Sequence, residues 1–147
     1  MKNTIFYTSD DWTDLIPRLT LGLVIFPHGA QKALGWFGGY GFSGTMGFFT
    51  DTMNLPWLIA FMVIVIEFIG SISLIAGFAS RIWSACTIVL MLSIILTSHI
   101  DNGFFMNWLG KQKGEGYEYH LLIIGLSLAI LINGSGKFSL DEKLTKG

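Results

Sequence analysis

The sequence is poor in charge and has almost no cysteine. Only 13% of its 147 residues are charged, whereas 52% are hydrophobic, which is far from the composition of a soluble domain. The net charge of -1 gives no basic surface, so nucleic acid is not expected as a partner. The single cysteine, Cys86, lies in an apolar stretch, which excludes an internal disulfide and a CxxC redox pair. This composition predicts a single integral membrane domain over residues 1–147.

The N-terminus lacks the pattern of a cleaved signal peptide. Residues 1–14 are polar and acidic, where such a peptide needs a basic start and an apolar core. Ser9, followed by Asp10, Asp11 and Asp14, instead suits a helix N-cap with carboxylates in the first turn. The first apolar segment is therefore expected to remain in the protein as a membrane span.

Four apolar segments are separated by polar or glycine-rich stretches. About 20 helical residues cover the hydrocarbon core of a bilayer, and these segments come close to that length. Residues 35–56, rich in glycine and aromatics, predict an interfacial loop with a short helix at 45–53, and residues 100–116 predict a second interfacial loop. The predicted fold class is an all-α four-helix membrane bundle, with spans at residues 15–34, 57–78, 82–99 and 117–132.

Lysine and arginine are distributed unequally over the two sides that four spans create. Positive residues favour the cytoplasmic side of a membrane. The side with fewer of them carries Lys32, Lys111 and Lys113. Both termini are therefore expected in the cytoplasm of a bacterial cell, with the protein in its inner membrane. The side with both termini carries Lys2, Arg18, Arg81, Lys137, Lys143 and Lys146.

Ionisable residues of all four predicted spans fall at a similar depth near the outer surface. Such groups are costly within a bilayer, so they usually face a bundle interior or a water-filled cavity. His28 and Lys32 are four residues apart and share a helix face, and Glu67 and Glu118 are available as counter-ions. The sequence therefore predicts a polar pocket near the outer surface, formed by His28, Lys32, Glu67, His99, Glu118 and His120.

Purely structural roles remain open for these polar residues. The alternatives are an interfacial ion pair between Lys32 and Glu118, an interhelical hydrogen bond from Glu67, and a packed position in the bundle for His28. A second polar set is expected to be structural, with its arginines as anchors that extend to the membrane surface; it consists of Arg18, Arg81 and Asp141. A stripe of small residues that favours helix packing consists of Gly70, Ser73 and Gly77.

Metal and nucleotide motifs are not supported by context. The histidines lie on three different predicted spans with no HxxxH or HxxE spacing, so no metal is predicted. A GxGxxG pattern follows a membrane helix rather than a strand, which argues against dinucleotide binding; its glycines are Gly39, Gly41 and Gly44. No cofactor is encoded by a motif, and no catalytic residue is assigned.

Several motifs together resemble the DoxX family of small four-helix membrane proteins. They are Arg18 with Gly22, Pro27-His28-Gly29 and Lys32; Glu67, Gly70, Gly77 and Arg81; Asn102-Gly103-Phe104-Phe105 with Gly116-Tyr117-Glu118; and Gly134-Ser135-Gly136 with Ser139-Leu140-Asp141. The resemblance implies a link to redox complexes, because the family is named after a membrane subunit associated with thiosulfate:quinone oxidoreductase. It also implies that Arg18, His28, Lys32, Glu67, Arg81 and Glu118 are recurrent polar positions.

Two functions from different classes follow. The first is a redox accessory subunit that binds a quinone in the polar pocket, with electrons supplied by a membrane or periplasmic redox protein, because imidazole and ammonium groups donate to carbonyls and carboxylates exchange protons. The second is a non-enzymatic scaffold or assembly factor for a partner complex. The lipid bilayer is the expected environment, and a homo-oligomer is possible. A transporter is less favoured because four short spans enclose little space and no inverted repeat is evident.

Overall fold

The computed structural model describes residues 6–8 and 11–146, and these residues form helices and loops without a strand. The predicted cap residues Ser9 and Asp10 lie outside this range. Helix α1 (Trp12–Leu34) is capped by Asp11, whose carboxylate accepts a 3.0 Å hydrogen bond from the backbone N–H of Thr13. This hydrogen bond lowers the pKa of Asp11.

The remaining long helices are built from shorter elements that follow one another without a break. Residues 57–76 comprise α3 (Trp57–Val65), the π-helical turn η3 (Ile66–Gly70) and α4 (Ser71–Ala76). Residues 80–102 comprise α5 (Ser80–Ile94), the π-helical turn η4 (Ile95–His99) and the 3-10 turn η5 (Ile100–Asn102). These two stretches are long and apolar enough to cross a membrane, and the apolar helix α6 (Glu118–Asn133) is shorter.

Short elements complete the chain. The loop after α1 holds η1 (Trp36–Gly38), α2 (Gly41–Gly47) and η2 (Phe48–Thr52), so helical structure begins earlier than the predicted residue 45. The polar segment after α6 includes the short helix α7 (Leu140–Lys146).

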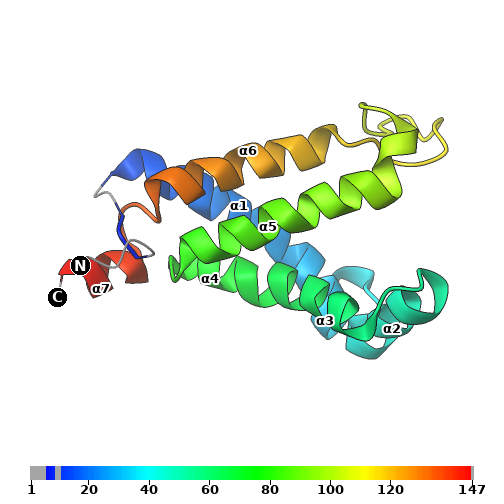
Figure 1. Cartoon of the computed structure of the whole chain (residues 1–147), viewed down its shortest axis with the longest axis horizontal. Helices are drawn as coiled ribbons and strands as arrows, with labels where there is room; N and C mark the ends of the chain where they lie inside the picture. The colour runs from blue at the N-terminus through cyan, green and yellow to red at the C-terminus, as the bar shows by residue number, and fades with distance from the viewer. Residues whose placement is uncertain (1–5, 9–10, 147) are drawn as a thin grey trace.

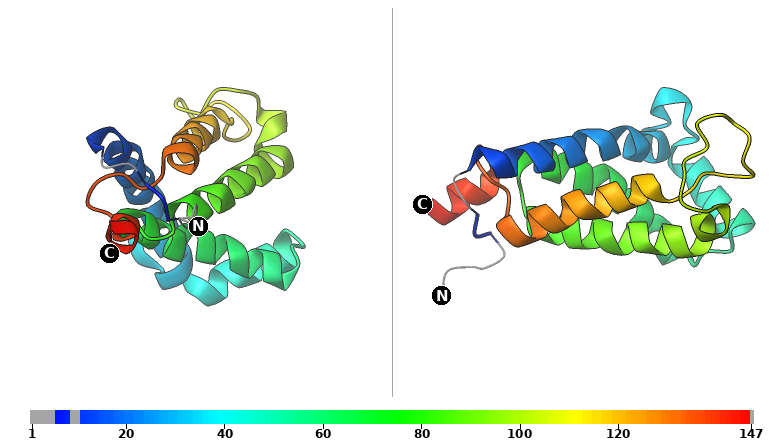
Figure 2. Two further views of the ribbon diagram at one scale, coloured as in Figure 1. Left: turned by 60° about the vertical axis from the view of Figure 1, so that its left-hand side comes forward. Right: turned by 90° about the horizontal axis from the view of Figure 1, so that it is seen from above.

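The long helices run antiparallel and spread apart toward one end (Figure 1). Helices α5 and α6 pack against each other, α1 packs against α4, η3 and α6, and α2 packs against α1 and α3. The start of α1, the α4–α5 turn and α7 lie together at what we call the terminal end, while α2 and the 103–117 loop lie at the opposite, loop end (Figure 2). The two hairpins diverge at the loop end.

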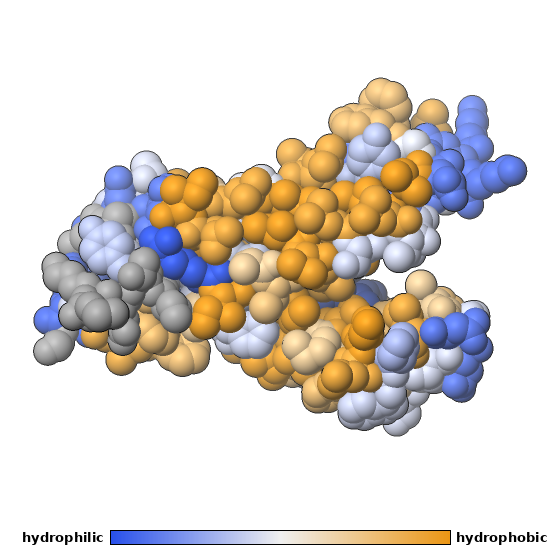
Figure 3. Space-filling model, viewed as in Figure 1, coloured by the Kyte–Doolittle hydropathy of each residue, from blue (hydrophilic) through white to orange (hydrophobic). Residues whose placement is uncertain are grey.

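The apolar core lies between the four long helical segments. The exposed faces of these helices are also apolar, for example at Leu23, Val89 and Leu122, and hydrophobic residues dominate the middle of the visible surface (Figure 3). Apolar exposure along helices buried on their other face is typical of a surface that meets lipid. The core residues are Leu21, Ile25, Leu74, Leu90, Met91, Ile123 and Ile130.

Arg18 closes the terminal end by binding backbone carbonyls. It is 1% exposed, and its Nη1 donates to the carbonyls of Leu74 (3.0 Å) and Ile75 (2.8 Å) at the C-terminus of α4. Its Nη2 donates to the carbonyl of Lys137 at 3.1 Å. The interpretation of Arg18 as an anchor that extends to the membrane surface is therefore wrong, because the guanidinium instead satisfies the free carbonyls of a helix end.

Gly77 makes this arrangement possible. It ends α4 with φ +71°, and a Cβ there would lie 2.7 Å from Nη1 of Arg18. Gly77 is therefore a turn residue, and its carbonyl accepts a 2.9 Å hydrogen bond from the backbone N–H of Asp141 in α7.

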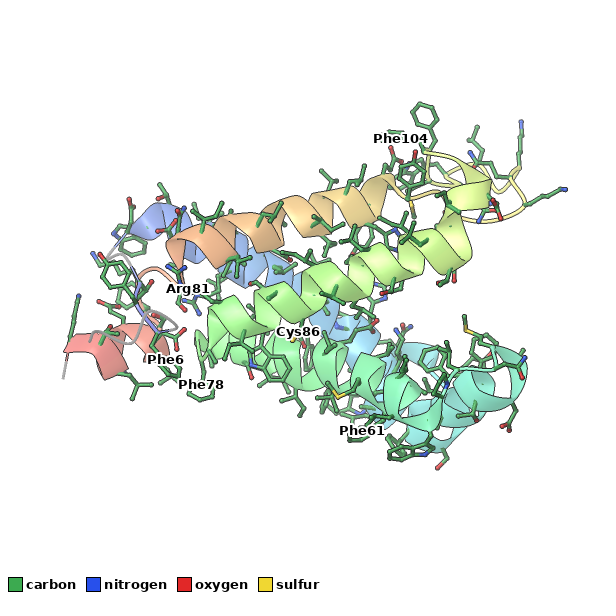
Figure 4. All side chains as sticks on the ribbon, viewed as in Figure 1. Phe6, Phe61, Phe78, Arg81, Cys86 and Phe104 are labelled. Atoms are coloured by element: carbon green, nitrogen blue, oxygen red, sulfur yellow. The ribbon has the colours of Figure 1, made fainter. Side chains whose placement is uncertain are left out.

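Asp141 and Arg81 satisfy two further helix ends. The Asp141 carboxylate accepts hydrogen bonds from the N–H groups of Ala79 (2.7 Å) and Ser80 (3.1 Å) at the start of α5, and from the Ser135 hydroxyl. Arg81 Nη1 donates to the carbonyl of Leu131 in the last turn of α6 at 2.6 Å, and Figure 4 shows Arg81 at the terminal end. The predicted structural role of this set thus has a specific form, in which charged side chains cap helices that are distant in sequence.

We expect Asp141→Ala to destabilise the protein by about 3 kcal/mol, because it leaves buried N–H groups at the start of α5 without an acceptor. Thermal unfolding in detergent, followed by tryptophan fluorescence, should show a midpoint lower by roughly 10 °C. Lys143→Ala, at an exposed position in the same short helix, is the matched control. Equal midpoints for the two variants would show that α5 does not depend on this cap.

Candidate functional site

The site begins with an unusually close contact between α1 and η3. A Cβ at Gly29 would overlap the carbonyl of Glu67 and lie 2.6 Å from Cα of Phe68. Gly22, two turns earlier on α1, similarly allows close contact with α4, where its Cβ would lie 3.1 Å from the Ser71 carbonyl oxygen. Because neither position has a side chain, the backbones approach closely.

This contact brings Lys32 against Glu67. Lys32 lies one turn after Gly29, and its Nζ is 2.5 Å from Oε2 of Glu67. The carboxylate side chain is 7% exposed and the lysine side chain 24% exposed. Glu67 lies in a π-helical turn, a local widening of the helix that is frequent at functional sites. The pair neutralises two charges that would otherwise be costly at this depth.

Two histidines form the facing wall. The rings of His99, in the π-helical turn η4, and His120, in the first turn of α6, are 4.5 Å apart between centroids. His99 Nδ1 donates to the carbonyl of Glu115 at 2.6 Å, which ties the end of this helix to the 103–117 loop. His120 is buried and also contacts the ring of Tyr119 at 5.9 Å.

These groups line one cavity of about 430 Å³, here called the main cavity. The volume falls within the range of small-molecule sites. Figure 3 shows the molecule hollowed at the loop end, between the α5–α6 hairpin and the α2–α3 segment. Its walls are largely apolar, and its polar or ionisable lining residues are His28, Lys32, Glu67, His99, Glu115, Tyr119 and His120.

Glu118 lies elsewhere, which corrects the predicted pocket. Its Oε1 accepts hydrogen bonds from the backbone N–H of Met106 (2.9 Å) and from Nε1 of Trp108 (3.3 Å). It lines a separate, second cavity of about 550 Å³ with Trp108 and Leu122. Of the two carboxylates that the sequence left open as counter-ions of Lys32, the structure pairs Glu67 with it, so the alternative of a Lys32–Glu118 ion pair does not hold. Glu118 instead stabilises the loop before α6, because two residues of that loop, Met106 and Trp108, donate hydrogen bonds to its carboxylate.

Seven residues that line the main cavity were not identified from the sequence: Ile25, Met91, Ile94, Met106, Glu115, Tyr119 and Ile123. Tyr119 and Glu115 lie close in sequence to residues that were predicted. Tyr119 also lies four residues before the buried Ile123, and residues at this spacing share one face of a helix, here the inward one. Met106 lies in an irregular loop, where no periodicity gives its direction. His28 does line the cavity but is exposed, so it lies at the mouth rather than in the bundle interior.

The small-residue stripe is used within the chain. A Cβ at Gly70 would lie 2.8 Å from the indole ring of Trp83 in α5, so this glycine gives room to an aromatic side chain of the same protein. Ser73 is half-buried, and its carbonyl accepts the N–H of Phe78 in the turn after α4. Gly70 therefore allows the contact between η3 and α5, whereas the Ser73 carbonyl stabilises the turn that ends α4.

Comparison with known proteins agrees with this architecture. The family model described as DoxX matches residues 13–100, which include α1 except its first residue, η3 and all of α5. The chain belongs to the DoxX family. A protein of Bacillus subtilis (strain 168) named "Putative oxidoreductase CatD" is 29% identical over 133 residues, which is 90% of this chain and 87% of that protein. No solved structure matches the chain. DoxX proteins are membrane-associated, in line with the apolar helices described above.

We expect Gly29→Ala to lower the stability of this DoxX protein by about 2–3 kcal/mol, because the added methyl group meets backbone that cannot move aside. Gly125→Ala in α6, where a Cβ would meet open space, should leave the thermal unfolding midpoint in detergent unchanged or slightly raised. If both variants unfold at the native midpoint, the close α1–η3 contact does not contribute to stability.

Proposed function

We propose that this DoxX protein is a four-helix protein of the bacterial inner membrane and an accessory subunit of a quinone-linked redox complex. The observation that carries the proposal is the Lys32–Glu67 ion pair in a largely apolar cavity at the loop end. The four predicted spans correspond to α1, residues 57–76, residues 80–102 and α6, and the bias of lysine and arginine favours cytoplasmic termini. The main cavity then lies toward the outer surface.

The chemistry of the main cavity suits a quinone. A quinone is a flat, apolar ring with carbonyl oxygens that accept hydrogen bonds, and its reduction requires protons. Ile25, Ile94 and Ile123 supply apolar walls for such a ring. Lys32 and Tyr119 supply donors, and Glu67 supplies a group that exchanges protons. Electrons come from a partner redox protein of the membrane or periplasm. The name of the Bacillus subtilis relative, an oxidoreductase, fits this reading.

The scaffold alternative loses one of its supports in this structure. An exposed stripe of small residues would support a scaffold, because it offers a partner helix a surface on which to pack. In this protein, however, Gly70 faces Trp83 of the same chain and Gly77 faces Arg18. A helix from another protein is therefore not needed to explain these glycines. The quinone function has the stronger support.

Quinone binding should depend on Lys32. In lipid nanodiscs, we expect the protein to bind menadione, measured by quenching of tryptophan fluorescence, and Lys32→Met to weaken binding about tenfold or more, because a charged donor is lost from a desolvated site. Lys111→Met removes a charge from an exposed loop position at the same end of the molecule and should bind as the native protein does. Unchanged affinity in Lys32→Met would contradict the proposed site.

The orientation of the protein in the membrane can be tested by labelling introduced cysteines after the single native cysteine has been removed. In a Cys86→Ser background, Lys113→Cys should react with a membrane-impermeant maleimide on intact spheroplasts, whereas Lys143→Cys should react only after permeabilisation. Each position is exposed, so access to the reagent reflects the side of the membrane. The opposite labelling pattern would place the main cavity on the cytoplasmic side.

A further inference from the structure

The second cavity adjoins the main cavity and has no role in the function proposed above. Met106 and Tyr119 line both cavities, so these two side chains form a shared boundary. The volume of the second cavity, about 550 Å³, falls within the range of small-molecule sites. Its other lining residues are Phe104, Trp108, Glu118, Leu121 and Leu122.

The lining of the two cavities is continuous around helix α6. Successive residues of an α-helix are about 100° apart around its axis, which gives the order Glu118, Leu122, Tyr119, Ile123, His120 around this helix. The first two of these residues line the second cavity, the last two line the main cavity, and Tyr119 between them lines both. The surface that a ligand would contact therefore extends from the inner face of α6 to its outer face.

The second cavity is largely apolar and lies at the surface that faces lipid. Leu121 and Leu122 are 45% and 69% exposed. Phe104 is also exposed and lies beside the start of α6 (Figure 4). The carboxylate of this cavity, from Glu118, already accepts hydrogen bonds from Met106 and Trp108. An apolar occupant therefore suits the cavity.

We infer that the second cavity holds the isoprenoid tail of a quinone whose ring binds in the main cavity. This inference rests on the quinone function proposed above. Quinones that dissolve in a membrane carry such tails, and the tail of a ring bound in the main cavity needs an apolar exit. The loop end beside His28 carries hydrophilic residues at its tips (Figure 3), so a tail that left there would lie among polar groups.

The tail leaves the main cavity between Met106 and Tyr119. Methionine is unbranched and flexible, so Met106 can adjust to a chain that passes beside it. Lipid is as apolar as a protein groove, so the tail gains little hydrophobic free energy by entering the second cavity. What the second cavity provides is space, because a tail without an exit would keep its ring out of the main cavity.

The test uses the full chain in lipid nanodiscs and two ligands with the same naphthoquinone ring, menadione without a tail and menatetrenone with an isoprenoid tail. Binding of radiolabelled menadione is measured directly, and menatetrenone, dissolved in the nanodisc lipid, is measured by its displacement of menadione. We expect Leu122→Trp, which fills the second cavity, to weaken menatetrenone binding about tenfold or more and to leave menadione binding unchanged. Val89→Trp, at a similarly exposed position of α5 that lines neither cavity, should bind both ligands as the native protein does.

The outcomes separate this inference from the proposed function. If Leu122→Trp binds menatetrenone as the native protein does, or loses both ligands equally, the inference is overturned and the second cavity is left to an acyl chain of the bilayer. Menadione binding that menatetrenone cannot displace from the native protein also overturns the inference alone. If the native protein binds neither quinone, the proposed function fails as well.

A second measurement needs no variant and therefore does not depend on whether Leu122→Trp folds. A naphthoquinone with a photoreactive diazirine in an isoprenoid tail should label the native protein within residues 104–122, identified by mass spectrometry of peptides. Labelling found only on other segments would overturn the inference.

Discussion

The ion pair between Lys32 and Glu67 is the constraint on which the loop end of this protein depends. Two opposite charges are stable in an apolar bundle only when they are in contact, because each alone carries a large desolvation cost. Contact at 2.5 Å requires α1 and η3 to lie backbone to backbone, and Gly29 provides that approach. The position of α1 against η3 is therefore set by electrostatics and by the absence of a side chain together.

The two ends of the bundle are organised in opposite ways. At the terminal end, the charged side chains of Arg18, Arg81 and Asp141 form hydrogen bonds with backbone groups at helix ends. These hydrogen bonds satisfy the free backbone groups and connect the helices. At the loop end, the hairpins diverge, and the 103–117 loop is held by Glu118 and His99. A bundle fixed at one end can leave a cavity at the other, and the ionisable groups of that cavity are available for chemistry.

The DoxX family match and the main cavity involve different parts of the chain. The family match rests on residues 13–100, which carry Lys32 and Glu67. The cavity argument rests also on Tyr119 and His120, which lie beyond that match. Residues from both parts of the chain are needed to complete the polar lining, so the last long helix belongs to the site as much as the first.

The sequence alone located the apolar helical segments and the ionisable residues within and beside them, because hydrophobic length and charge position are local properties. It also drew attention to five of the polar residues that line the main cavity, namely His28, Lys32, Glu67, His99 and His120. Only the tertiary structure decided which carboxylate meets Lys32. From the sequence, Glu67 and Glu118 were equivalent candidates for the counter-ion of Lys32. Which of them contacts Lys32 depends on the packing of α1 on η3 and on the path of the irregular loop before α6. The same holds for Arg18, whose partners include carbonyls more than fifty residues away, because no local pattern encodes which helix end a buried guanidinium will reach.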